Sequence, residues 1–188
     1  MNKLNKNINQ ETATTQTAKG GQVEPLVMPQ GTKVFDNRKL FDKERVDKCA
    51  KSIEWETPPE VFEPLDTEFN FTLDVCATEG NAKCEHYFTK EQDGLSQFWS
   101  GMCWMNPPFG RSVKSWIGKA KEEAEAGRAT TVCLIPAKTN TNWWHEMIID
   151  KAEVRFIRGR IKFIKDGKQA TQALPWPMAI VVFRALTV

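Results

Sequence analysis

Hydrophobic and polar positions divide the chain into two parts of different character. Residues 1–22 are rich in Asn, Gln, Thr, Lys and Gly and have scarcely any large apolar side chain. Burial there cannot offset the entropy lost on ordering. We therefore expect residues 1–32 to form a disordered or loosely docked tail, and residues 33–188 to form one domain. Apolar positions at helical spacing over 35–53 predict a short amphipathic helix.

From residue 55 onward, apolar runs alternate with amphipathic stretches. Residues 112–127 predict a helix with one apolar face, which ends at the C-cap glycine Gly127. Residues 130–135 form a continuous β-branched and apolar run, which is typical of a strand buried on both faces. Thr141 suits the N-cap of a second helix that runs to residue 148. The other segments that predict strands are 69–75, 102–105, 154–163 and 178–183.

Repeated strand–helix–strand units predict an α/β fold. We expect a mostly parallel sheet with an antiparallel strand near the C-terminus. In such sheets, ligands bind beyond the carboxyl ends of the strands. Asp74 and Asn106 each stand at such an end, so we expect them side by side at one edge.

Composition and charge narrow the class of protein. A net charge of +2 over 188 residues does not by itself indicate a nucleic-acid partner. Five cysteines are scattered without a CxxC pair, and His86 and His145 lack metal-ligand spacing. We therefore expect neither a disulfide framework nor a metal site. The absence of a membrane-length apolar run, and of a signal-peptide pattern at the N-terminus, favours a cytoplasmic protein without a membrane partner.

The most informative motif is Asn106-Pro107-Pro108-Phe109, which follows the apolar run 102–105. Two successive prolines remove two backbone donors and fix φ twice, so the strand must end there in a stiff loop. The Asn106 amide oxygen can accept one N–H of a planar ring with an amino group, and the Pro107 carbonyl can accept a second. Phe109 can stack on the face of that ring.

This tetrad resembles the catalytic motif of amino-group DNA methyltransferases, which methylate adenine N6 or cytosine N4. Over residues 53–184 the chain is similar to the small phage-type DNA N6-adenine methyltransferases (Dam-like family). The ordered set of motifs is more specific than the tetrad, because glutamine methyltransferases use a similar tetrad. The matching segments are Trp-Glu-Thr-Pro-Pro-Glu-Val-Phe at 55–62, Leu-Asp-Val-Cys-Ala at 73–77, Tyr-Phe-Thr at 87–89, Asp-Gly-Leu at 93–95, the tetrad, and Arg-Gly-Arg-Ile-Lys-Phe at 158–163.

The resemblance implies a Rossmann-like, S-adenosylmethionine-dependent methyltransferase fold. It further implies that the substrate is adenine in double-stranded DNA, flipped out of the duplex and methylated by direct SN2 transfer. The catalytic residues would then be Asn106, Pro107, Pro108 and Phe109. A phage gene would place the protein in the cytoplasm of a bacterial host, where restriction–modification is a further implied context.

The resemblance also implies a cofactor site around Asp74 and Cys76, where a carboxylate suits the ammonium and sulfonium of S-adenosylmethionine. An ordinary strand-ending aspartate is the alternative. The chain departs from many methyltransferases after this strand, because residues 76–80 lack a Gly-x-Gly turn. The contacts of this loop are therefore less defined by the motif than those of the tetrad.

Four further residues have a possible cofactor role. Thr57 and Pro58 match the segment that holds the cofactor carboxylate, although they also suit a helix N-cap and first turn. Trp55 is expected to pack, with the adenine ring of the cofactor as one partner. Asp93 lies 19 positions after Asp74, an interval that suits a ribose-binding acid. A turn aspartate before a glycine is the other reading of Asp93, and three glutamates compete for the ribose: Glu79, Glu85 and Glu91.

Basic side chains follow several of the predicted strands. Their functional interpretation is contact with DNA phosphates, and the alternative for each one is an ordinary solvated charge. Arg111 is the strongest candidate because it lies next to the tetrad. The full set of expected DNA-binding residues is Arg111, Lys114, Lys138, Arg158 and Arg160.

The sequence leaves several functions open. A cytosine N4 methyltransferase would use the same chemistry, and a protein glutamine methyltransferase would use a similar tetrad. A non-catalytic DNA-binding module and an α/β domain of unrelated function also remain to be distinguished. The residues do not define the recognition sequence, which could be GATC or a relaxed adenine context, nor the oligomeric state.

Overall fold

The computed structural model of this chain describes residues 55–165 and 167–186. The expected N-terminal tail, the boundary at residue 32, the helix over 35–53 and Cys49 all lie outside the described residues. These expectations therefore stay predictions.

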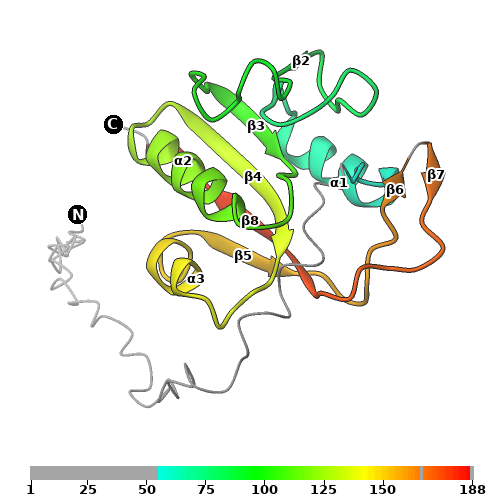
Figure 1. Ribbon diagram of the computed structural model, residues 1–188. Helices are drawn as coiled ribbons and strands as arrows, with labels where there is room; N and C mark the ends of the chain where they lie inside the picture. Colours follow the sequence, from blue (N-terminus) through cyan, green and yellow to red (C-terminus); the bar gives the residue numbers. More distant parts are fainter. Residues whose placement is uncertain (1–54, 166, 187–188) are drawn as a thin grey trace, which may run out of the picture. The chain divides into compact units, whose positions relative to one another are not determined.

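A six-stranded sheet forms the centre of the described part (Figure 1). Its strands lie in the order β2-β1-β3-β4-β8-β5. The first four run parallel to one another, whereas β8 runs antiparallel to both β4 and β5. The expected α/β class, with a mostly parallel sheet and an antiparallel strand near the C-terminus, is confirmed. The strands are β1 Leu73–Asp74, β2 His86–Tyr87, β3 Gly101–Met105, β4 Ala129–Pro136, β5 Glu153–Phe156 and β8 Met178–Phe183.

Helices cover both faces of this sheet because the side chains of each strand alternate between them. On β4, Val132 and Leu134 pack in one apolar cluster with helix α1, whereas Cys133 and Ile135 pack in the other with α2 and α3. All four side chains are fully buried, which explains the continuous apolar run of this strand. The helices are α1 Pro59–Phe69, α2 Val113–Glu125 and α3 Asn142–Met147.

Helix α2 confirms the amphipathic prediction. It is followed by Gly127, whose φ of 69° lies in the left-handed region that glycine adopts without strain. Thr141 is the N-cap residue of α3, as expected, but its hydroxyl donates back to the Lys138 carbonyl (2.8 Å) and not into the helix. The expected apolar face of α2 is buried: Val113, Trp116, Ile117, Ala120 and Ala124.

The prediction of a strand over 69–75 was wrong at its beginning. Phe69 is the last residue of α1, and Asn70 ends the helix with a φ of 53°. Phe69 is apolar because it is buried against the sheet, and the sequence alone does not separate that cause from strand burial. The β1 strand comprises only Leu73 and Asp74.

The prediction of a strand over 154–163 was also too long. The β5 strand ends at Phe156, and the Ile157 N–H donates to the carbonyl of Met178, the first residue of β8 (3.1 Å). Beyond that point β8 offers no partner, so the chain leaves the sheet. It then forms a separate hairpin of β6 (Ile164–Lys165) and β7 (Lys168–Gln169).

Candidate active site

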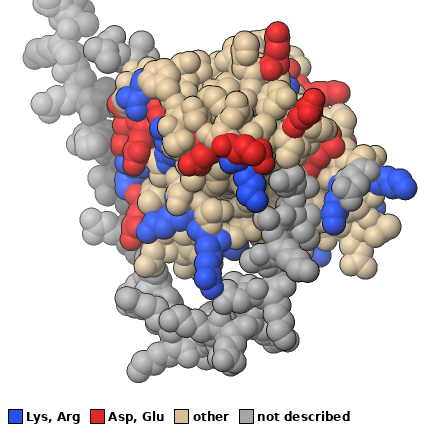
Figure 2. Space-filling model, turned by 45° about the horizontal axis from the view of Figure 1, so that its top comes forward, with Lys and Arg blue, Asp and Glu red and all other residues tan. Residues whose placement is uncertain are grey.

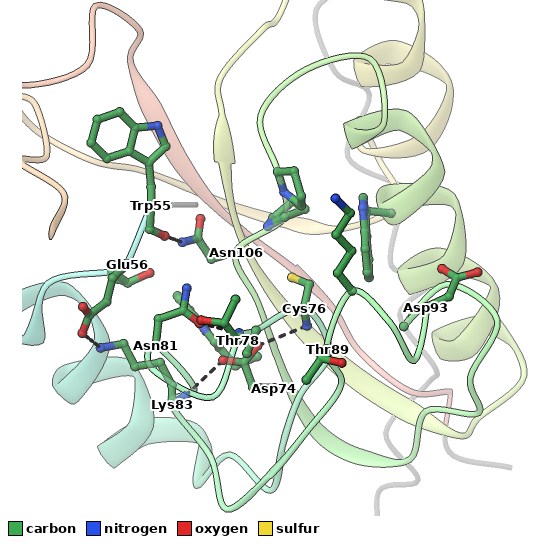
Figure 3. A pocket seen from close by; sticks show the side chains of 18 residues that line it. Trp55, Glu56, Asp74, Cys76, Thr78, Asn81, Lys83, Thr89, Asp93 and Asn106 are labelled. Carbon is green, nitrogen blue, oxygen red and sulfur yellow. Dashed lines mark hydrogen bonds and ion pairs between the residues drawn. The ribbon is translucent and has the colours of Figure 1, made fainter. Parts of the chain in front are cut away.

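A pocket of about 180 Å³ lies at the carboxyl ends of β1 and β3, where sheets of this kind bind ligands. The segment before α1, the loops after β1 and β2, and the loop after β3 form its walls (Figure 3). Asp74 and Asn106 both line it, as their strand-end positions led us to expect. The other sequence-assigned residues in its wall are Trp55, Thr57, Cys76, Asp93, Pro107 and Pro108.

Asp74 is buried, with 3% of its surface exposed. Its Oδ1 accepts a hydrogen bond from the Cys76 backbone N–H (3.2 Å), and its Oδ2 accepts one from the Lys83 backbone N–H (3.1 Å). Burial raises the pKa of this carboxyl to about 6, although both hydrogen bonds and the Lys83 charge act to lower it. A cation bound beside Asp74 would favour the ionised form. This end of β1 is therefore suited to a positively charged ligand group.

Asn106 is held from a distant part of the chain. Its Nδ2 donates to the backbone carbonyl oxygen of Trp55 at 2.6 Å. Its Oδ1 is buried and accepts no hydrogen bond from the described residues. Buried acceptors without a partner are uncommon and costly. The amide is thus oriented so that its oxygen can accept an N–H from a ligand.

The structure separates the fourth tetrad residue from the other three. Pro107 and Pro108 are in the pocket wall, but Phe109 is not among the described lining residues. The Phe109 ring packs edge-on against Phe163, with centroids 5.7 Å apart. Phe163 also contacts Trp55 (6.1 Å between centroids), so these three rings form an aromatic group next to the pocket.

Thr57 lines the pocket, but it is not the N-cap of α1. That position belongs to Pro58, which is extended (φ −69°, ψ 150°), and Pro59 is the first helical residue. The N-cap interpretation of Thr57 is therefore wrong by one residue. Thr57 is 1% exposed, and its hydroxyl has no hydrogen-bond partner among the described residues. Among the described residues, Pro58 is not one of those that line the pocket.

Asp93 lies in a turn and also lines the pocket. Its φ is 50°, and the next residue, Gly94, packs against the end of β1. A Cβ on Gly94 would lie 2.2 Å from the Val75 carbonyl oxygen, so only glycine fits. The turn interpretation is thus correct for the backbone, and the carboxylate stands at the opposite side of the pocket from Glu56 (Figure 3).

Cys76 lines the pocket without offering a thiolate. Burial and then the neighbouring Asp74 carboxylate raise the pKa of its thiol well above the usual value. The Asn106 backbone N–H hydrogen bonds this sulfur, which only partly opposes the shift. The thiol therefore stays protonated and is not a nucleophile at neutral pH.

The sequence-based assignment missed several pocket residues. Lys83 and Glu56 form an ion pair across the pocket wall (2.9 Å), with 15% and 26% of their side chains exposed. Glu56 lies inside the matched segment 55–62, which is a signal that could have identified it. Lys83 follows the irregular loop after β1, and no spacing rule points to it. The remaining missed lining residues are Ala77, Thr78, Asn81, Thr89, Lys90, Gly94, Trp104 and Trp116.

The expected DNA-binding residues come from three segments: the loop after β3 with the start of α2, the loop after β4, and the segment after β5. Figure 2 shows basic and acidic side chains intermixed on the face that it presents. Lys138 lies over the Trp176 ring (5.7 Å), after the end of β4. Arg155 on β5, which is not in the expected set, forms a bidentate ion pair with Glu68 (2.6 Å for each bond). Four of the five candidates are exposed: Arg111, Lys114, Arg158 and Arg160.

The described residues, 55–165 and 167–186, offer neither a metal site nor a helix that could cross a membrane. No group of three or more His, Cys, Asp or Glu side chains in these ranges could hold a metal ion. None of the helices described combines the length and hydrophobicity that a membrane span requires.

The fold and the pocket together define a class of protein. Three features are typical of a Rossmann-like methyltransferase that acts on amino groups. They are a mostly parallel sheet with β8 antiparallel near its end, an acidic residue at the end of β1, and an Asn-Pro-Pro-Phe loop after β3. Comparison with known proteins specifies the class further. The family model for DNA N-6-adenine-methyltransferase (Dam) matches residues 46–188.

Two phage proteins named DNA N-6-adenine-methyltransferase are similar to the chain over most of its length. The protein of Haemophilus phage HP1 is 31% identical over 150 residues, which cover 77% of this chain and 85% of the relative. The protein of Escherichia phage T1 is 30% identical over 155 residues, covering 81% of this chain and 63% of the longer relative. The chain belongs to the DNA N-6-adenine-methyltransferase (Dam) family, and it is an adenine-specific DNA methyltransferase.

Proposed function

We propose that this protein transfers a methyl group from S-adenosylmethionine to N6 of adenine in double-stranded DNA, with the base flipped into the pocket. The observation that carries the proposal is the Asn106 amide. Its Nδ2 is occupied by the Trp55 carbonyl, and its buried Oδ1 accepts no hydrogen bond from the described residues. An adenine amino group supplies the N–H that this oxygen lacks.

The chain's own groups can hold the amino nitrogen in a reactive state. Asn106 Oδ1 accepts a hydrogen bond from one N–H of the amino group, and the Pro107 carbonyl accepts one from the other N–H. These two hydrogen bonds draw the nitrogen lone pair out of conjugation with the ring. The Pro-Pro loop is stiff, so these acceptors are fixed before the base arrives, and orientation supplies much of the rate. Rotation of the base out of the duplex costs a few kcal/mol of stacking and pairing.

The pocket residues fit S-adenosylmethionine in two respects. The buried Asp74 carboxylate, whose pKa burial raises to about 6, suits a ligand with positive charge. The Thr57 hydroxyl, buried without a partner among the described residues, can donate to the ligand's carboxylate. Asp93, which also lines the pocket, is our candidate for the ribose hydroxyls.

When bound, S-adenosylmethionine supplies an electrophilic methyl group that the amino nitrogen takes directly. Asp74 and Thr57 hold the donor, and Asn106 with Pro107 orients the acceptor. The extra proton on the methylated nitrogen is strongly acidic and leaves to water, so no dedicated base is needed. The protonated Cys76 thiol takes no part in a covalent step.

The experiment that tests this proposal compares Asn106→Ala with wild type. We expect the variant to lose adenine methylation while S-adenosylmethionine binding, measured by calorimetry, stays within about threefold. Asn140→Ala, which removes an exposed loop amide, is the matched control and should keep full activity. Normal turnover by Asn106→Ala would overturn the assignment of the tetrad.

A further inference from the structure

The β6–β7 hairpin and the segment before it carry a series of exposed basic side chains. We call residues 158–170 the basic hairpin. None of these side chains takes part in an ion pair within the described residues, whereas six other cations there are paired: Lys83, Lys119, Lys121, Arg128, Arg155 and Arg184. The exposed basic side chains of the hairpin are Arg158, Arg160, Lys162, Lys165 and Lys168.

The local structure directs these charges outward. Ile161 and Phe163 are 6% and 1% exposed and anchor the segment in the apolar cluster of α1. Lys162 lies between these two anchors in the sequence and is exposed. The alternation therefore gives the basic hairpin one face packed on the domain and one face of positive charge.

Two of the lysines lie directly opposite each other. Lys165 pairs with Lys168 across the turn of the hairpin, where Gly167 has a φ of 71°. Like charges at directly opposed strand positions destabilise a hairpin. The pair therefore does not serve the stability of the free protein. A polyanion lying along this edge would remove the repulsion.

The basic hairpin is attached to the wall of the pocket. Ile164 and Glu56 form an antiparallel bridge with two backbone hydrogen bonds (3.0 and 2.9 Å). Glu56 lines the pocket, and the carbonyl of its neighbour Trp55 holds Asn106. Figure 1 shows the hairpin beside α1, on the side to which the arrows of β3 and β4 point.

The space-filling view supports this placement. Figure 2 keeps the left and right of Figure 1, and basic side chains stand out on the projecting part at its right, the side where the hairpin lies. The positive edge therefore lies on the α1 side of the sheet, next to the segment before α1 that lines the pocket.

We propose that the basic hairpin contacts backbone phosphates of the DNA next to the flipped adenine, with Lys165 and Lys168 as its central contacts. The proposal rests on the proposed function, because it takes DNA as the substrate of the adjacent pocket. Phosphate contacts position the duplex and carry no base information, so the hairpin raises affinity for all sequences alike.

The test compares Lys165→Gln/Lys168→Gln with a matched double variant of equal charge, Lys121→Gln/Lys151→Gln, on α2 and after α3. Binding to a fluorescent duplex is measured from 50 to 200 mM salt. We expect the hairpin variant to bind roughly tenfold more weakly. We also expect its slope of log affinity against log salt to be less steep than that of wild type by about 2. The control variant should match wild type in both quantities.

Two further measurements keep the result interpretable. Lys165→Arg/Lys168→Arg should restore affinity and slope, since arginine also binds phosphate. The unfolding temperature of the Lys165→Gln/Lys168→Gln variant should not fall, because the substitutions remove the repulsion between the two lysine side chains. An unchanged salt slope in a folded Gln variant would overturn the proposal, even if wild type methylates adenine. A reduced slope with no methylation by wild type would uphold the hairpin contact and overturn the proposed function.

Discussion

The side-chain amide of Asn106 donates to the backbone carbonyl of Trp55, 51 positions earlier in the chain, at 2.6 Å. Because the acceptor is a backbone atom, the orientation of the amide does not depend on the Trp55 indole. The bond leaves Asn106 Oδ1 as the amide atom that has no hydrogen-bond partner among the described residues. The position of the segment before α1 therefore decides which atom of the Asn106 amide is left to accept a hydrogen bond.

Asn106→Asp tests this relationship with almost no change in shape. A carboxylate has no N–H for the Trp55 carbonyl and would repel it, so the orientation is lost. We expect kcat to fall by about 10²–10³-fold, the range found when an oriented polar group at a reacting centre is removed. Steady-state kinetics on unmethylated DNA provide the measurement. A fall confined to KM would contradict the account.

Asp74 predicts a pH dependence of cofactor binding. Its pKa of about 6 in the free protein lies above the usual 3.8. A cationic ligand binds the ionised form better and lowers this pKa, so binding releases a proton. Affinity for S-adenosylmethionine should therefore strengthen as the pH rises from 5 to 7 and level off above 7. Calorimetry at a series of pH values measures this.

Asp74→Asn is the control for that profile. The amide has no charge to gain, so the variant should bind weakly and with little change between pH 5 and 7. A wild-type affinity that is flat over this range, or that weakens as the pH rises, would show that Asp74 does not face the cationic part of the ligand.

We expect Glu123, which lies away from the pocket, to contribute to the free energy of unfolding. This buried residue of α2 receives ion pairs from Lys119 (2.6 Å) and Arg128. Burial raises the pKa of its carboxyl, but the hydrogen bonds from Arg128 and Lys119 outweigh burial and lower it overall. Glu123 therefore stabilises the fold above its ordinary pKa of 4.5, and this contribution is lost as the pH falls through the lowered value.

Glu123→Gln should lower the free energy of unfolding at pH 7 by about 1–3 kcal/mol, because two cations lose their buried partner. The matched variant is Glu125→Gln on the same helix, whose ion pair with Lys121 is exposed. That variant should change stability by less than about 1 kcal/mol. Urea unfolding of both variants distinguishes the two cases, and equal effects would contradict the prediction.

We expect mutation to alanine to have opposite effects on stability at two glycines. At Gly94, a Cβ would meet the Val75 carbonyl oxygen at 2.2 Å and the Trp116 ring at 3.1 Å, so we expect a loss of about 1–3 kcal/mol. At Gly118, inside α2, a Cβ meets nothing within 4 Å, so alanine should stabilise by about 0.5–1 kcal/mol. Thermal unfolding measures both, and a stable Gly94→Ala protein would contradict the close approach.

The sequence was informative wherever the cause of a pattern was local. The continuous run 130–135 predicted a strand buried on both faces, and β4 is such a strand, with Val132 and Cys133 on opposite sides. The stiff Pro-Pro loop placed Asn106 at the end of β3. These features follow from periodicity and from proline chemistry, which depend on neighbouring residues only.

What the sequence missed depends on contacts between distant segments. The Trp55 carbonyl that orients Asn106 is a backbone atom, which has no signal in the side-chain pattern. The Lys83–Glu56 ion pair joins positions 27 apart through a loop that follows no spacing rule. Phe69 was assigned to a strand because burial makes helix ends and strands equally apolar.

We expect the protein to transfer a methyl group from S-adenosylmethionine to adenine N6. The most direct test is to incubate the purified protein with unmethylated duplex DNA and methyl-labelled S-adenosylmethionine, digest the DNA to nucleosides, and identify the labelled base. Label in N6-methyladenine, absent with Asn106→Ala, is the predicted result. Label in N4-methylcytosine, or no labelled base from protein that binds the cofactor and DNA, would contradict the account.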